Sequence, residues 1–255
     1  MLHVDVQGSG PALVLLHGWG LHGGVFAPLL PALHGHHTVY RVDLPGHGRS
    51  MDSGVPDTLA GWARAVLDAV PGQADWLGWS LGGLVAQQAA LLAPQQVRRL
   101  VVAASSPCFV RGPDWPHGIE AGLLAGFDSY LQQHYADTVD RFLALDLSNL
   151  DGGQQAAAQL RDNLLQVGRP QPQAVATGGR LLLDSDLRAQ LPGLEMRSLW
   201  LGGGRDRLVP PPAIRAAAAL APGAGQRLYP RSGHAPFLGD TDALAGDLLA
   251  FLAAG

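Results

Sequence analysis

The pentapeptide Gly78-Trp79-Ser80-Leu81-Gly82 joins a short apolar strand to a helical run. A serine in so tight a strand-to-helix turn must adopt a strained backbone conformation. The residues two before and two after it must also lack side chains, so that neighbouring segments can approach. Gly78 and Gly82 satisfy this requirement. We interpret the turn as a nucleophile elbow, which lifts the Ser80 hydroxyl above the end of a buried strand. The alternative is a glycine-rich connection that contains a serine by chance.

The composition predicts an ordinary globular protein. Hydrophobic residues make up 47% of the 255 residues and charged residues only 15%, which argues against disorder. The net charge is -4 without a basic stripe, which argues against nucleic acid as a partner. Cys108 is the only cysteine, so no internal disulfide can form. The sequence shows neither a signal-peptide pattern nor an apolar run of about 20 residues. We therefore expect a monomeric, cytoplasmic protein with no membrane partner.

The order of elements predicts the fold class. Strand patterns occur at 2–7, 12–16, 38–42, 75–77, 99–104, 197–201 and 226–229. Helical patterns occur at 25–33, 59–70, 84–93, 211–220 and 240–254. Residues 107–187 show helical faces and no convincing strand, which predicts an inserted helical lid. Because strands and helices alternate on both sides of it, we predict an α/β fold. Its core, 1–106 and 188–255, should be a mostly parallel sheet flanked by helices.

A serine nucleophile needs a base, and the base needs an orienting acid. Asp206 follows the strand at 197–201, and His234 follows the strand at 226–229. The order Ser80, Asp206, His234 is the one expected with a nucleophile elbow. Taken singly, Asp206 could be a turn-capping residue and His234 a surface histidine. Asp184 and Asp186 are rival acids, but they do not follow a strand.

Two backbone amides are candidates for an oxyanion hole. The N–H of Leu81 lies at a helix N-terminus, and the N–H of Trp19 lies in the glycine-flanked loop 17–20. That loop could equally be an ordinary connection with a packed tryptophan. The indoles of Trp19 and Trp79 could form apolar walls beside Ser80.

Other chemistry-bearing residues favour structural roles. The histidines in 34–37 lack a nearby carboxylate or thiolate and precede a strand, so we interpret them as a solvated turn rather than a metal site. Cys108 is interpreted as a small buried apolar residue. We therefore expect neither a metal nor a cofactor.

Several longer strings carry a family resemblance. The triad order, with His17-Gly18 and the loop 43–50, resembles the α/β-hydrolase superfamily. The strings at 17–20, 76–85, 104–109, 141–145 and 234–237 resemble the pimeloyl-[acyl-carrier protein] methyl ester esterases of biotin synthesis. The likeness extends from about residue 12 to 237, which is nearly the whole chain.

The resemblance implies a serine carboxylesterase that hydrolyses the methyl ester of a pimeloyl chain on acyl carrier protein. It implies substrate contacts at Trp19, Leu81, Phe142, Leu143, Ala144, Leu145 and Asp146. It also implies carrier docking through basic lid residues, here Arg141 and Arg161. The predicted lid, however, holds five arginines against ten acidic residues.

Two other functions stay open. One is a broad small-ester or C–C bond hydrolase outside biotin synthesis, and the other is a hydrolase-fold ligand receptor with slow turnover. Haloalkane dehalogenases and epoxide hydrolases, which resemble this fold, use aspartate where this chain has Ser80.

Overall fold

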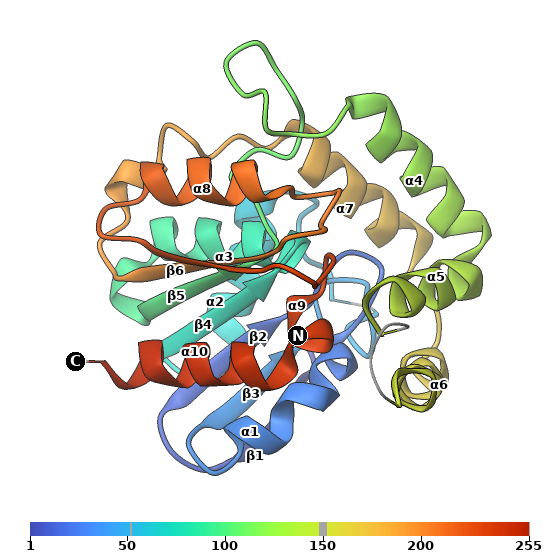
Figure 1. Ribbon diagram of the computed structural model, residues 1–255, viewed down its shortest axis with the longest axis horizontal. Coiled ribbons are helices and arrows are strands. Elements are labelled where there is room, and N and C mark those ends of the chain that lie inside the picture. Colours follow the sequence, from blue (N-terminus) through green and yellow to red (C-terminus); the bar gives the residue numbers. More distant parts are fainter. Residues whose placement is uncertain (52, 148–151, 255) are drawn as a thin grey trace.

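A seven-stranded sheet forms the centre of the molecule (Figure 1). The computed structural model describes residues 1–51, 53–147 and 152–254. The strands are β1 (Val4–Gly8), β2 (Ala12–Leu16), β3 (Thr38–Val42), β4 (Ala74–Trp79), β5 (Val97–Ala103), β6 (Ser198–Gly203) and β7 (Gly225–Tyr229). Their order is β1-β3-β2-β4-β5-β6-β7. Only β1 pairs antiparallel with its neighbour, so the prediction of a mostly parallel sheet is confirmed.

Helices cover both faces of this sheet (Figure 1). One face is covered by α2 (Leu59–Ala69), α3 (Leu81–Leu92) and α8 (Pro211–Leu220), and the other by α1 (Leu30–Leu33), α9 (Pro236–Gly239) and α10 (Thr241–Ala253). Short 3-10 helices lie at η1 (Gly23–Leu29), η2 (Pro94–Gln96) and η3 (Leu191–Gly193). The helix predicted at 25–33 is split into η1 and α1. Pro28 lies inside η1 and contributes no backbone N–H to a regular helix.

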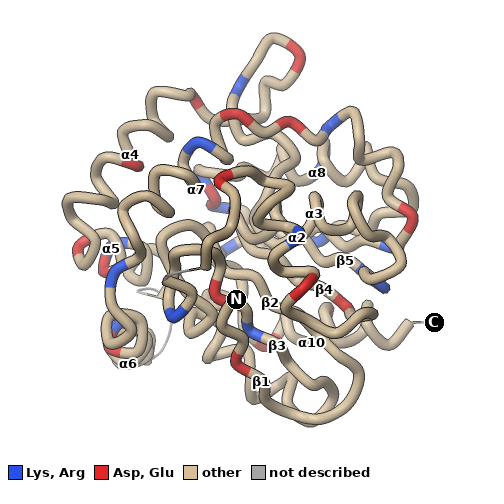
Figure 2. Tube along the Cα trace, turned by 180° about the vertical axis from the view of Figure 1, so that it is seen from behind, with Lys and Arg blue, Asp and Glu red and all other residues tan. Residues whose placement is uncertain are grey.

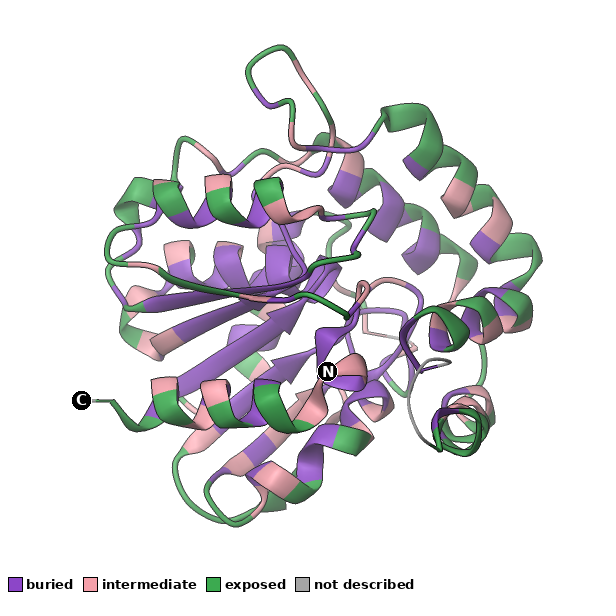
Figure 3. Ribbon diagram, viewed as in Figure 1, coloured by how far each residue is buried: buried purple, intermediate pink, exposed green. Residues whose placement is uncertain are grey.

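The alternation of side chains along the central strands divides the core into two layers. In β2, Leu13 and Leu15 belong to one hydrophobic cluster, whereas Val14 and Leu16 belong to the other. All four are fully buried, as expected for a parallel sheet with helices on both faces. Figure 3 shows the same pattern, with buried central strands and exposed outer helix faces. This packing holds the strand ends rigidly in place.

Between β5 and β6, the described part of the chain forms four α-helices. They are α4 (Ala121–Gln133), α5 (Tyr135–Leu147), α6 (Gly153–Gln166) and α7 (Pro172–Asp184). They gather beyond the end of the sheet toward which the strand arrows point (Figure 1). We call residues 107–187 the lid segment, and its boundaries stay a prediction. None of the helices among the described residues is long and apolar enough to cross a membrane.

Candidate active site

Ser80 has the backbone strain that the sequence predicts. Its φ of 54° and ψ of -120° lie in a region that side-chain-bearing residues rarely adopt. A Cβ on Gly78 would lie 2.4 Å from the Gly82 carbonyl oxygen, and a Cβ on Gly82 would lie 2.4 Å from the carbonyl oxygens of Leu16 and His17. The two glycines therefore allow β4, α3 and the end of β2 to meet at the serine.

Ser80, His234 and Asp206 form a continuous hydrogen-bonded series. His234 Nε2 lies 2.9 Å from Ser80 Oγ, and His234 Nδ1 lies 2.8 Å from Asp206 Oδ2. The other oxygen of Asp206 accepts from the amides of Leu208 at 2.8 Å and Val209 at 3.0 Å, which fixes the carboxylate. The three side chains predicted from their positions after β4, β6 and β7 therefore meet at one edge of the sheet.

The pKa of His234 is raised above its ordinary value of 6.5. Burial by itself lowers this pKa, but the charge of Asp206, its hydrogen bond to the ring and the charge of Asp146 outweigh burial. The imidazole can therefore accept a proton from Ser80 readily.

The rival acids lie elsewhere. Asp184 and Asp186 are both exposed, and Asp186 pairs with Arg188 at 2.6 Å. Cys108 is half-buried rather than fully buried, and burial followed by the charge of Asp186 raises the pKa of its thiol. A raised pKa makes a thiol a weaker nucleophile at neutral pH.

The amides of Trp19 and Leu81 lie on the two segments that meet at Ser80. Leu81 is the first residue of α3, and Trp19 follows β2 in the loop that contacts the elbow. A Cβ on Gly18 would lie 2.8 Å from the Trp79 ring, so this loop packs directly on the elbow. Within the described part of the chain, neither amide donates to a protein acceptor. Both donors are therefore available to a ligand.

Two buried histidines brace the Trp19 loop. His17 Nε2 accepts from the Leu44 amide at 2.9 Å, and His47 Nε2 accepts from the Gly20 amide at 3.2 Å. Their Nδ1 atoms donate to the carbonyls of Gly18 at 2.8 Å and Pro45 at 2.9 Å. Burial lowers the pKa of His17 to about 3 and that of His47 to about 4. Both rings are therefore neutral at physiological pH.

The aromatic side chains predicted beside Ser80 make contacts with the lid segment. The Trp19 ring lies 5.4 Å from Phe127 of α4, and its Nε1 donates to the Val175 carbonyl of α7 at 2.8 Å. The Trp79 ring lies 5.4 Å from Phe142 of α5 and 5.6 Å from His234. Trp19 and Trp79 thus connect the core to the lid segment.

Helix α5 divides the predicted substrate-contact residues between its two faces. Phe142 is half-buried and Leu143 is buried, whereas Ala144 is exposed and Leu145 is 76% exposed. Ala144 and Leu145 thus lie toward solvent, and Leu145, three residues after Phe142, lies next to it around the helix, at the border of the buried face. Ala144 and Leu145 are therefore exposed, and their role as substrate contacts stays a prediction. Figure 3 shows the exposed outer face of α5.

Asp146 is buried and bonds to the protein itself. Its Oδ1 accepts from the amides of Gly233 at 3.1 Å and Ala235 at 3.2 Å, the residues on either side of His234. One sequence signal could have indicated this contact, namely an acidic residue at helical spacing among the apolar residues Phe142, Leu143 and Leu147.

The two arginines predicted for carrier docking differ in environment. Arg161 is paired with Asp140 and lies 3.9 Å from Asp162, so its charge is balanced locally. Arg141 is exposed and stacks over the Tyr130 ring at 5.0 Å from the ring centre. Among the described residues, Arg141 forms no ion pair. Arg141 is thus the better candidate for an external acidic partner.

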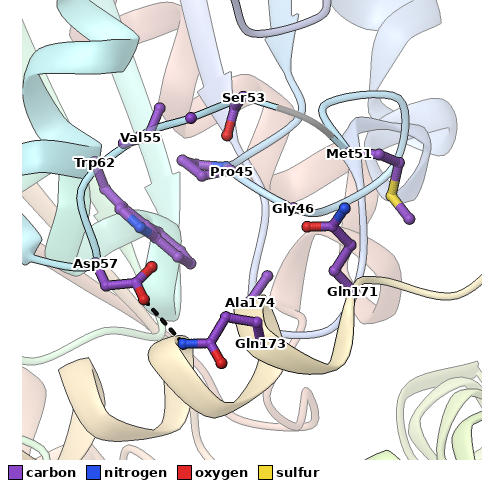
Figure 4. Close-up of a pocket in the computed structure, with 11 residues that line it drawn as sticks. Pro45, Gly46, Met51, Ser53, Val55, Asp57, Trp62, Gln171, Gln173 and Ala174 are labelled. Atoms are coloured by element: carbon purple, nitrogen blue, oxygen red, sulfur yellow. Dashed lines mark hydrogen bonds between the residues drawn. The ribbon is translucent and has the colours of Figure 1, made fainter.

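A separate cavity of about 380 Å³ lies between the loop after β3 and the start of α7 (Figure 4). Pro45, Val55 and Trp62 line one part of it, and Gln173 bonds to Asp57 across it at 2.9 Å. None of the predicted site residues lines this cavity.

Comparisons with known proteins agree on one family. The model of the alpha/beta hydrolase fold family matches residues 11–241. The chain is 47% identical over 253 residues to the pimeloyl-[acyl-carrier protein] methyl ester esterase of Stenotrophomonas maltophilia, covering 99% of this chain and 97% of that protein. The corresponding esterase of Xanthomonas oryzae pv. oryzae is 48% identical over 252 residues, with 99% of each covered.

Solved structures share the fold. A hydrolase from Pseudomonas aeruginosa has a TM-score of 0.82 at 30% identity, over 99% of this chain and 94% of that one. An esterase from Exiguobacterium antarcticum has a TM-score of 0.88 at 20% identity, over 99% of this chain and 96% of that one.

Proposed function

Because this chain belongs to the alpha/beta hydrolase fold family, and within it to the pimeloyl-[acyl-carrier protein] methyl ester esterases, we propose that it hydrolyses the methyl ester of a carrier-bound pimeloyl chain. The observation that carries the proposal is the series Ser80, His234, Asp206, with contacts of 2.9 and 2.8 Å at a strained elbow. No metal or cofactor enters this chemistry.

The reaction proceeds through an acyl-enzyme. His234 takes the proton of Ser80 as the serine oxygen attacks the ester carbonyl, and Asp206 stabilises the imidazolium that forms. The amides of Trp19 and Leu81 donate to the negative oxygen of the tetrahedral intermediate. His234 then gives the proton to the leaving methoxide, and methanol departs. Water repeats the cycle on the acyl-enzyme and releases the free carboxylate.

The substrate reaches the serine beneath the lid segment. Ser80 is only 7% exposed, and Phe142, Leu143 and Trp79 form apolar surroundings on its lid side. Apolar surroundings favour the methylene chain of a pimeloyl group, at about 0.8 kcal/mol for each buried CH₂. This supports an acyl chain, rather than a polar group, as the part of the substrate beside these residues.

The outer face of α5 is where we propose that the carrier protein docks. Arg141 offers an exposed charge, and Leu145, one turn later, is 76% exposed. The lid segment as a whole is acidic, and acidic and basic positions are interspersed along the chain trace (Figure 2). Steering of an acidic carrier therefore depends on the local charge of Arg141 rather than on the overall field.

Two experiments test this function. Ser80→Ala should lower hydrolysis of the carrier-bound methyl ester by at least about 10⁴-fold with unchanged circular dichroism. The wild-type chain should also restore growth without biotin to a strain that lacks this esterase, and Ser80→Ala should not. Hydrolysis of small esters without such rescue would refute the pimeloyl substrate, and an active Ser80→Ala would refute the mechanism.

Docking is tested with Arg141→Glu. The variant should raise KM for the carrier-bound ester and leave a small chromogenic ester unaffected, and added salt should weaken wild-type carrier binding. Arg161→Glu is the matched comparison, because Arg161 is already paired with Asp140. An equal effect of Arg141→Glu on both substrates would argue against docking.

A further inference from the structure

The loop that carries His234 is held from two sides by side chains distant in the sequence. From the core, Trp79 Nε1 donates to the His234 carbonyl at 2.8 Å. From α5 of the lid segment, Asp146 Oδ1 accepts from the amides of Gly233 and Ala235 at 3.1 and 3.2 Å. The peptide groups on both sides of the imidazole are therefore fixed by hydrogen bonds.

The loop that carries His234 is closely packed around this contact. A Cβ on Gly233 would lie 2.8 Å from Asp146 Oδ1, and a Cβ on Gly203 of β6 would lie 1.8 Å from the Gly233 carbonyl oxygen. The loop is thus confined between the end of β6 and the carboxylate of α5. One turn before Asp146, Phe142 packs on the same Trp79 ring that bonds to His234.

Burial of the Asp146 carboxylate costs free energy, which is unusual for a residue with a purely structural role. It is 6% exposed, and its Oδ2 is buried without a hydrogen-bond partner among the described residues. Burial, followed by the charge of Asp206, raises the pKa of Asp146, although the two amides and the charge of His234 oppose the shift. A buried carboxylate oxygen without a partner calls for an explanation beyond packing.

We propose that Asp146 is a positioning residue for the proposed reaction, a carboxylate from the lid segment that holds the His234 loop in register with Ser80 and adds negative charge beside the imidazolium. The inference rests on the proposed function, since it assumes that His234 is the base. It assigns Asp146 a role different from the substrate contact implied by the resemblance.

The groups that act on His234 are few. Asp206 bonds to its Nδ1, Ser80 Oγ lies at its Nε2, and Asp146 acts through its charge. On the same loop, Arg231 and Ser232 are both engaged with Asp240. Asp146 and Asp206 are thus the two carboxylates whose removal should change the pH at which His234 titrates.

The test compares Asp146→Asn with Asp146→Ala. Asparagine keeps an oxygen for the two amides but removes the charge, whereas alanine removes both. Asp137→Asn is the matched control, because Asp137 is an exposed acid in the first turn of the same helix. Each variant is assayed with p-nitrophenyl butyrate and by its rate of labelling with a fluorophosphonate, which forms a P–O bond to an activated serine and releases fluoride.

We expect Asp146→Ala to lower both kcat and the labelling rate by about 10- to 100-fold, with KM within about 3-fold, because a misplaced base slows proton transfer without weakening binding. Asp146→Asn should recover most of this loss, but its acid limb in kcat/KM should move to lower pH. Asp137→Asn should match the wild type.

Three results would overturn the proposal. A raised KM with unchanged labelling in Asp146→Ala would make Asp146 a substrate contact. If Asp146→Asn were as slow as Asp146→Ala, the oxygen that accepts from the two amides would not matter for the rate. If the acid limb of kcat/KM did not move in Asp146→Asn, the charge of Asp146 would not act on His234. If Asp146→Ala does not fold, the acid limb of kcat/KM in Asp146→Asn still tests the proposal. Labelling that persists in Ser80→Ala would instead refute the proposed function.

Discussion

The buried histidines of the Trp19 loop should make the fold sensitive to mild acid. His17 and His47 each use one ring nitrogen to accept from a backbone amide, at 2.9 and 3.2 Å. Protonation would place an N–H against each of those amide hydrogens, and both rings are fully buried. In the unfolded chain both rings are free to take up a proton below a pKa of roughly 6.5.

The size of the effect follows from these pKa values. The folded pKa is about 3 for His17 and about 4 for His47, so the unfolded state binds more protons at any pH between these values and 6.5. Stability is therefore present at neutral pH and lost as the pH falls through 6.5. From pH 7 to pH 5 each histidine contributes a loss of about 2 kcal/mol, or about 4 kcal/mol together.

Three other histidines change the total loss of stability. The pKa of His37 is lowered, chiefly by burial, which adds to the loss. The pKa of His22 is also lowered, chiefly by burial, which adds to the loss. The pKa of His234 is raised despite burial, so the folded state takes up that proton first and gains some stability. The net loss remains a large part of the 5–15 kcal/mol that is usual for unfolding.

Urea denaturation at pH 7 and pH 5 measures this loss. With a slope of about 3 kcal/mol per M, the midpoint should fall by about 1 M. His47→Gln should remove about half of the shift, because the amide oxygen can still accept from Gly20 but does not titrate. His36→Gln, at an exposed histidine, should keep the full shift. A shift of equal size in His47→Gln and the wild type would refute the reasoning.

Three further predictions concern the site. Asp206→Asn should lower kcat by about 10⁴-fold through the wrong histidine tautomer, measured with a small ester, whereas equal damage by Asp184→Asn would contradict the choice of acid. The acid limb of kcat/KM should have its midpoint above 6.5, because the pKa of His234 is raised and only the neutral ring accepts a proton. A midpoint below 6.5 would count against this. Gly203→Ala should cost about 1–3 kcal/mol in urea denaturation, because its Cβ would overlap the Gly233 carbonyl oxygen, and an unchanged midpoint would contradict the packing.

The triad could be predicted because each member has a local signal. Ser80 lies between glycines that a strained turn requires, and Asp206 and His234 each follow a strand of a parallel sheet. Parallel strands bring their ends to one edge, so three positions far apart in the chain become neighbours. The mostly parallel sheet with helices on its faces follows from the alternation of strands and helices in the sequence.

The lid contacts could not be predicted in the same way. Asp146 and Gly233 are separated by 87 residues, and no local sequence pattern near either residue predicts their contact. The resemblance supplied a continuous stretch, 142–146, whereas a helix presents only part of any stretch to one side. The stretch accordingly includes Ala144 and Leu145, which are exposed in the structure, as well as the buried Leu143 and Asp146. The short helix α9 was also missed, because four residues show no periodicity.

Burial lowers the pKa of His17, His47 and His234 alike, but the net shift of His234 is opposite because its partners differ. The ring nitrogens of His17 and His47 bond to neutral backbone groups, so burial dominates and both rings stay neutral. His234 bonds to a carboxylate and lies in the field of a second one, so its pKa rises instead. As the pH falls from 7, His234 should therefore be protonated before the fold loses the contribution of His17 and His47. Activity should accordingly be lost first and return on neutralisation, whereas stability should decline only at lower pH.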